Sequence, residues 1–288
     1  MMPPQTNESV RLPSLDVLGR DLLQVSPAQR LWTIGLPFLL ILLYFIFANL
    51  NFWLPAFGSV VLLSMLTYGS SSHDLVHQTL GLSKFWNHFW LSLIEIMCFR
   101  SGTAYRLSHL HHHRNLLDSS DIEGSAVRLS LFETLFSGPT MQIRLRYWAS
   151  QRYPEQRNRL LAEAVGILAL VLTAAIFRES CPELAVYAVL TIGGSWFFPL
   201  VTVYLPHSAD GDSPLTQTRL FRGLWYRIIS LDHLYHLEHH LYPAVPHHHW
   251  RRLALRLDPW VTASAHAADP TIPAVARPDS GDSCFGKP

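Results

Sequence analysis

Residues 31–72 read LWTIGLPFLLILLYFIFANLNFWLPAFGSVVLLSMLTYGSSS, and none of these 42 positions carries a charged side chain. A helix needs about 20 apolar residues to cross a bilayer, so this run predicts two crossings, at 31–49 and 53–72. The interruption Asn49–Asn51, followed by Pro55, has turn chemistry and lies at the middle of the run. We therefore expect a tight transmembrane hairpin.

Two later apolar runs, at 160–177 and 184–206, predict a second hairpin. Four crossings place the N-terminal arm (1–29), the middle stretch and the C-terminal region on one side of the membrane. Of the 22 Lys and Arg residues, only Arg178 is then assigned to the far side, as the positive-inside rule expects. We expect an all-α, multi-pass integral membrane protein whose two termini are cytoplasmic.

The composition agrees with this class. Hydrophobic residues make up 49% and charged residues only 15%, whereas soluble domains usually carry about a quarter charged residues. A net charge of +1 gives no sign of nucleic-acid binding. The three cysteines form no C-x-x-C pair, so we expect reduced thiols and no disulfide framework.

Two segments complete the expected domain organisation. Phe85–Phe99 is apolar and aromatic but too short for an easy crossing, so we expect a helix that lies in the interface. The alternative is a third spanning helix. Residues 30–265 form the expected membrane domain, and 266–288, rich in Pro, Asp and Ser, are expected to be a disordered tail.

Histidine is the outlier of the composition, with 16 residues. Three groups have helical spacing, which places the imidazoles of each group on one side of a helix. Neutral imidazoles at this spacing suit a transition metal. With His207, which closes the last crossing, nine imidazoles are too many for one ion and suit two ions with open positions. The groups are His73 with His77, His109 with His112 and His113, and His236 with His239 and His240.

Carboxylates near these groups are candidates to bind the outward-facing ring nitrogens and so fix the tautomer. The chain lacks the Glu-x-x-His tetrad of carboxylate-bridged di-iron bundles, so the expected ligands are mostly imidazole. We expect Glu238, which lies between two candidate ligands, not to be a ligand itself. The candidates are Asp74, Asp118, Asp121, Glu123, Asp232 and Glu238.

The remaining histidines are expected to be bystanders. His111 and His233 are out of phase with their groups, and His88 is expected only to cap the interfacial helix. His247–His249 precede Trp250 and predict a solvent-exposed helix start.

The segments His73-Asp74-Leu75-Val76-His77, His109-Leu110-His111-His112-His113 and His236-Leu237-Glu238-His239-His240 resemble the three histidine boxes of the membrane fatty acid desaturase superfamily. That superfamily includes carotenoid hydroxylases and ketolases. The continuation of the last box, HHLYPAVP at 239–246, and the spacing of Asp118, Asp121 and Glu123 strengthen the resemblance, which covers residues 30–255.

The resemblance implies a cytosolic helical cap that holds a non-haem di-iron centre and uses O2 to oxidise a C–H bond. His207 matches a further iron ligand of acyl-CoA desaturases. Those enzymes have an asparagine four residues earlier that holds a water near the metal, and Val203 stands there in this chain. Carried over by position, the iron ligands are His73, His77, His109, His112, His113, His207, His236, His239 and His240.

The expected reaction is oxidation of an unactivated C–H bond of a membrane lipid, with fatty acyl desaturation first and carotenoid ring hydroxylation or ketolation as the alternative. The boxes do not separate these outcomes, because the outcome depends on how the substrate is placed. Trp86, Phe89, Trp90 and Tyr105 are candidate substrate-lining residues, and equally candidate interface anchors. No catalytic residue is expected apart from the ligands.

The chain lacks a haem, flavin, nicotinamide or iron–sulfur motif, so electrons are expected from a separate donor of the ferredoxin, rubredoxin or cytochrome b5 type. From other classes, we considered a membrane metal transporter, a haem protein and a catalytically silent scaffold. A transporter would place its ligands at the bilayer midplane, whereas these histidines follow the apolar runs.

Overall fold

The computed structural model describes residues 12–211 and 213–268. Over these residues the fold is all-helical and contains no β-strand, as expected. The first eleven residues and most of the predicted tail lie outside the described residues.

Within the described part of the chain, four helices are long and apolar enough to cross a membrane. They begin and end within a few residues of the predicted crossings, except that the second continues to His77. The first histidine pair is therefore part of its last turns. The four candidate spans are Pro27–Asn49, Trp53–His77, Pro154–Ile176 and Pro182–Tyr204.

The spans are built from α2 (Pro27–Asn49), α3 (Trp53–Leu66) with α4 (Ser72–His77), α8 (Arg157–Ile176) and α9 (Pro182–Ser195). Pro27 stands at the first helical position of α2, and Ser26 and Gln29 form a capping box there, so the sequence itself fixes where α2 begins. Pro182 likewise stands at the first helical position of α9, where no side chain caps the helix.

The outward faces of these helices are apolar. On α8, five exposed side chains recur at helical spacing, each between 51% and 71% exposed. A soluble monomer rarely exposes such an apolar stripe to water, whereas the acyl chains of a bilayer would cover it. The five are Leu161, Val165, Leu168, Leu172 and Ile176.

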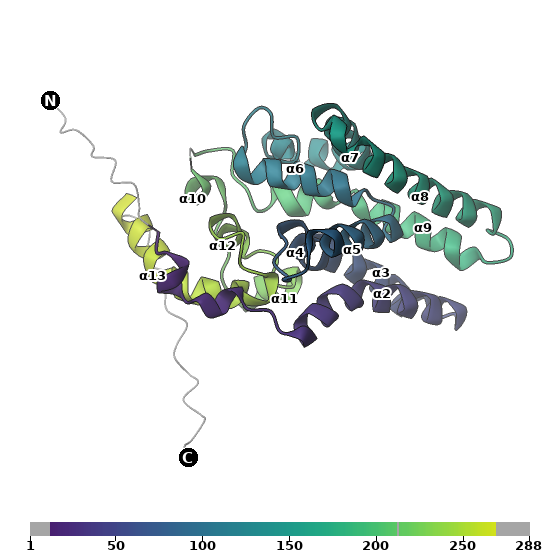
Figure 1. Ribbon diagram of the computed structural model, residues 1–288, viewed down its shortest axis with the longest axis horizontal. Coiled ribbons are helices and arrows are strands. Elements are labelled where there is room, and N and C mark those ends of the chain that lie inside the picture. The colour runs from purple at the N-terminus through teal and green to yellow at the C-terminus, as the bar shows by residue number, and fades with distance from the viewer. Residues whose placement is uncertain (1–11, 212, 269–288) are drawn as a thin grey trace, which may run out of the picture.

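Inside, α2, α3 and α9 contact one another around a buried core. Tyr44 and Tyr187 lie in this core with ring centroids 5.2 Å apart, and the Tyr44 hydroxyl donates to the carbonyl of Glu183 at 2.6 Å. In Figure 1, α2, α3, α8 and α9 lie toward the right of the molecule and α12 and α13 toward the left.

Two of the spans contain π-helical segments. Residues Thr67–Ser71 (η2) join α3 to α4, and Pro199–Tyr204 (η5) end the last span. Both lie a few residues before histidines, namely His73 and His207. π-Segments insert an extra residue into a helical turn and occur often at functional sites.

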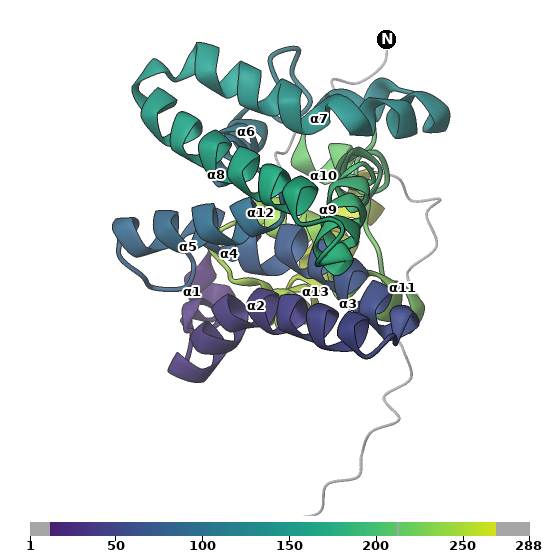
Figure 2. The ribbon, with the colours of Figure 1, turned by 90° about the vertical axis from the view of Figure 1, so that its right-hand side faces the viewer.

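The segment between the second and third spans folds into α5 (Lys84–Met97), α6 (Gly102–Arg114), η3 (Gly124–Arg128) and α7 (Leu131–Arg152). With 14 residues, α5 is too short to be a spanning helix. In Figure 2, α7 and α8 lie on one side of the molecule and α2 and α3 on the other, with α4 and α9 between them.

Two buried carboxylates attach the histidine-bearing helices α6 and α4 to neighbouring helices. Glu163 of α8 accepts hydrogen bonds from the Ser101 hydroxyl and from Thr103 N at 3.0 Å, at the first turn of α6. Glu95 of α5 accepts from the Ser72 hydroxyl at 2.5 Å, beside His73.

The C-terminal part contains α10 (Pro214–Gln217), α11 (Leu224–Ser230), α12 (His236–Leu241), η6 (His247–His249) and α13 (Trp250–Ala268). α13 extends three residues past the predicted start of the tail. The N-terminal segments α1 (Leu15–Leu18) and η1 (Arg20–Leu23) pack against it, and Asp21 pairs with Arg256 at 2.7 Å.

Candidate metal centre

The nine histidines predicted as ligands lie in two adjacent groups, the only groups among the described residues that could hold a metal ion in this way. In each group, one nitrogen or oxygen atom per residue lies within 4.8 Å of all the others. α4, α6, α12 and the segment that follows η5 supply them, so the structure brings together all three boxes and His207. Group one contains His73, His77, His109, His113 and His239, and group two contains His112, His207, His236 and His240.

In group one, four Nε2 atoms form a closed ring. The Nε2–Nε2 distances are 3.1 Å from His73 to His109, 3.1 Å from His109 to His113, 2.7 Å from His113 to His239 and 3.0 Å from His239 to His73. Metal–nitrogen bonds of about 2.1 Å at right angles would place two nitrogens about 3.0 Å apart. The ring therefore has the size that a bound ion needs.

In group two, the Nε2 atoms form a chain. His207 lies 3.2 Å from His112 and 3.0 Å from His236, and His236 lies 3.0 Å from His240. The groups adjoin, because the rings of His113 and His240 stack with centroids 4.4 Å apart.

Hydrogen bonding alone does not explain these contacts. Each Nε2 carries either a proton or a lone pair, so at most two of the four contacts in the group-one ring are hydrogen bonds. The Nε2 of His77 and the Nδ1 atoms of His73 and His239 are buried and find no partner within the described residues. A cation would engage the converging lone pairs together, so the donor set fits a transition metal.

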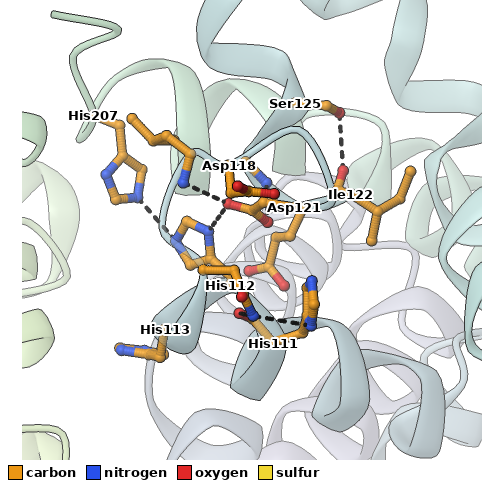
Figure 3. A network of polar contacts seen from close by, with 12 residues as sticks. His111, His112, His113, Asp118, Asp121, Ile122, Ser125 and His207 are labelled. Atoms are coloured by element: carbon orange, nitrogen blue, oxygen red, sulfur yellow. Dashed lines mark hydrogen bonds and ion pairs between the residues drawn. The ribbon is translucent and has the colours of Figure 1, made fainter. Parts of the chain in front are cut away.

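The outward nitrogens of three rings are held in place. His109 Nδ1 donates to Glu123 at 2.8 Å, His112 Nδ1 to Asp121 at 2.7 Å, and His207 Nδ1 to the Gln217 carbonyl at 3.3 Å. Each contact turns the lone pair of Nε2 inward, toward its group. Figure 3 shows His112 between Asp121 and His207.

The pKa values follow from burial and these contacts. Burial lowers the pKa of His236, His239 and His240 well below the ordinary value, and that of His207 to about 3, so these rings are neutral as ligation requires. Burial alone would also lower the pKa of His112, but the Asp121 carboxylate raises it.

The other carboxylate candidates lie differently. Asp74 accepts from the backbone of His247 at 3.0 Å and so attaches α4 to the segment before α13. Asp118 is exposed and accepts from Ser120 N at 2.7 Å, in a local turn. Asp232 lies in the turn before α12 with φ of 66°. Glu238 is fully buried and pairs with Arg222.

Most of the predicted bystanders are bonded elsewhere. His111 Nε2 contacts the Ser120 carbonyl at 3.1 Å, and His88 contacts Arg159. The expectation of a solvent-exposed start at 247–249 is wrong for His249, which is buried and donates to the Gln24 carbonyl at 2.9 Å. His248 contacts the Thr33 hydroxyl at 2.7 Å, so η6 is attached to α2.

A cavity of about 810 Å³ adjoins both groups. It follows the second span, from Phe57 in α3 to His73 in α4, which is about 24 Å at the rise of an α-helix. The fourth span, α9 and η5 with the residues between them, forms the facing wall, where exposed Val189 and Phe197 place the opening on the outward surface of the spans. His236 of group two also lines the cavity.

Only one of the four predicted lining residues lies in this wall. Tyr105 lines the cavity, and its hydroxyl donates to the Tyr68 carbonyl at 2.9 Å. Trp86, Phe89 and Trp90 instead contact one another on α5 and are not among the residues that line the cavity. Their other expected role, as anchors at the membrane interface, stays a prediction, because the sequence does not show which way α5 faces.

Asp121→Asn tests whether the outward contact matters for metal binding. The amide cannot replace the charge that favours the donating Nδ1–H of His112, so we expect affinity for a transition metal to fall about 10- to 100-fold. Titration of metal-stripped protein measures this. Asp118→Asn is the matched control, and an equal loss in both variants would contradict the assignment.

The family model described as fatty acid desaturase matches residues 51–268, which include all nine histidines. No curated protein matches the chain.

Proposed function

The chain belongs to the fatty acid desaturase family, and from this premise we propose that it is a membrane di-iron oxidoreductase that desaturates a fatty acyl chain with O2. The family supports an oxidoreductase that acts on lipid. The four candidate spans support a membrane location, and the histidine groups support a metal.

The observation that carries the proposal is the convergence of nine imidazoles into two adjoining groups. Group one would hold one iron and group two the other. Bound there, the irons would supply the electrons for O2 and the oxidising power that removes hydrogen from an unactivated carbon.

The protein's own contribution is placement. His73 of group one and His236 of group two both line the cavity, so a chain lying in it passes both metal positions. The walls are mainly apolar side chains of the second and fourth spans, which would hold a hydrocarbon and exclude water from the reacting carbon. The opening between exposed apolar residues supports entry from the bilayer.

All nine histidines lie at the same end of the four candidate spans, and we assign this end to the cytoplasm by the positive-inside rule. A separate ferredoxin, rubredoxin or cytochrome b5 would deliver electrons there. Ligands at the ends of the spans rather than at their middle argue against a metal transporter.

Metal analysis of the purified full chain, paired with mass spectrometry of the host's lipids, tests the proposal. We expect two irons per chain and acyl chains that have lost two hydrogens. Zinc in place of iron would contradict the metal assignment. Acyl chains without change, beside oxygenated carotenoids in a carotenoid-making host, would favour the ring hydroxylase or ketolase instead.

A further inference from the structure

His233 belongs to neither metal group but lines the same cavity as His73 and His236. It lies in the turn between α11 and α12, one helical turn before His236. Its ring is half-buried, and its Nε2 atom is buried without a hydrogen-bond partner in the described part of the chain. A buried polar atom without a partner costs free energy unless a ligand or water satisfies it.

The structure holds this ring tightly. A Cβ atom on Gly69 would lie 2.3 Å from the Nδ1 and Cε1 atoms of His233. Only a glycine at this position of η2 therefore leaves room for the imidazole. On its other side, the ring meets His247 with centroids 5.3 Å apart. Packing therefore fixes His233 against the π-segment at the histidine end of the cavity.

The chemistry of this ring is that of an uncharged hydrogen-bonding group. Burial lowers the pKa of His233 to about 4, so the imidazole is neutral near pH 7. A neutral ring nitrogen hydrogen-bonds a hydroxyl, ester or ketone oxygen and offers no ionic attraction to a carboxylate.

His233 also lies where the polar end of a lipid would be. The rest of the cavity extends from this end along α3 toward Phe57. Ile229 of α11 lines it and is 70% exposed, and the neighbouring Trp225 is 74% exposed, which suits a segment at the membrane surface.

We propose that His233 hydrogen-bonds an uncharged oxygen of the lipid substrate and holds it beside the two histidine groups, with the hydrocarbon chain between α3 and α9. This inference rests on the proposed function and adds a substrate class: a lipid whose hydroxyl, ester or ketone oxygen lies close to the carbon that is oxidised.

A competition for binding tests this without turnover. The full chain in detergent, metal-stripped or iron-loaded, is mixed with equal amounts of octadecanol, methyl octadecanoate and octadecane, and the lipids that co-elute are quantified by mass spectrometry. We expect the two oxygenated chains to be retained about tenfold over the alkane, the size of one buried hydrogen bond. His233→Phe should remove this preference and His233→Gln should keep part of it.

His88→Phe is the matched control, because His88 lies outside the residues that line the cavity. Equal retention of all three lipids by the unchanged protein would overturn the inference. So would a loss of all three in His233→Phe, which would indicate a steric role. Iron content and lipid oxidation test the proposed function separately, so either idea can fail alone.

Discussion

Replacement of His239 by alanine is expected to lower turnover by at least about 100-fold, since loss of a metal contact costs more than loss of its supporting residue. The His239 side chain is fully buried, and its Nε2 atom lies 2.7 Å from that of His113 and 3.0 Å from that of His73. No neighbouring side chain can take its position without moving α12. Metal analysis should show about one iron fewer per chain, namely the one that group one would hold.

His248→Ala is the matched control. His248 is partly buried and, like His239, makes a short contact, in its case to Thr33 at 2.7 Å. It lies outside both groups. Removal of the His248 side chain weakens the attachment of η6 to α2 and should leave most of the activity. Equal losses in His239→Ala and His248→Ala would show that the division into ligands and bystanders is wrong.

Arg100→Leu should destabilise the fold by about 3–5 kcal/mol, the usual effect of leaving a buried charge without its partner. Arg100 and Glu95 are 1% and 0% exposed and pair at 2.6 Å. Glu95 also accepts from the Ser72 hydroxyl beside His73, so an unpaired carboxylate there would disturb α4 as well. Thermal unfolding in detergent measures the loss.

The double variant Glu95→Leu with Arg100→Leu separates charge from packing. If the cost arises from the unpaired carboxylate, the double variant should recover much of the stability. Arg178→Ala, which removes an exposed ion pair with Glu179, should change stability by less than about 1 kcal/mol. A double variant as unstable as Arg100→Leu would mean that the two side chains stabilise the fold through their packing and not through their charges.

The four candidate spans and the nine converging histidines follow from local patterns. An uncharged run of 42 residues and an i, i+3, i+4 spacing each specify a structure within one segment. The division of the nine histidines into a group of five and a group of four depends on how α4, α6 and α12 pack. His113, for example, belongs to group one while its neighbour His112 belongs to group two.

The carboxylates show the same limit. Asp121 and Glu123 hold ring nitrogens as the spacing suggested, but Asp118 is bonded in its own turn, a local contact that competes with any distant one. Glu163, which caps α6, was missed because its partners lie about sixty positions earlier in the chain. An acidic residue in an otherwise apolar span is the one signal that could have found it.

The π-segments η2 and η5 have a consequence for how such a chain can vary. An α-helix advances by about 100° per residue, so one extra residue within a turn changes the phase of everything after it. The lipid-facing side of α3 and the metal-facing side of α4 are thereby set independently along one continuous span. A single-residue deletion in Thr67–Ser71 would keep the membrane anchor and turn His73 and His77 away from their neighbours. Insertions and deletions at these two sites are thus one class of mutation that would remove the centre while the protein stays in the bilayer.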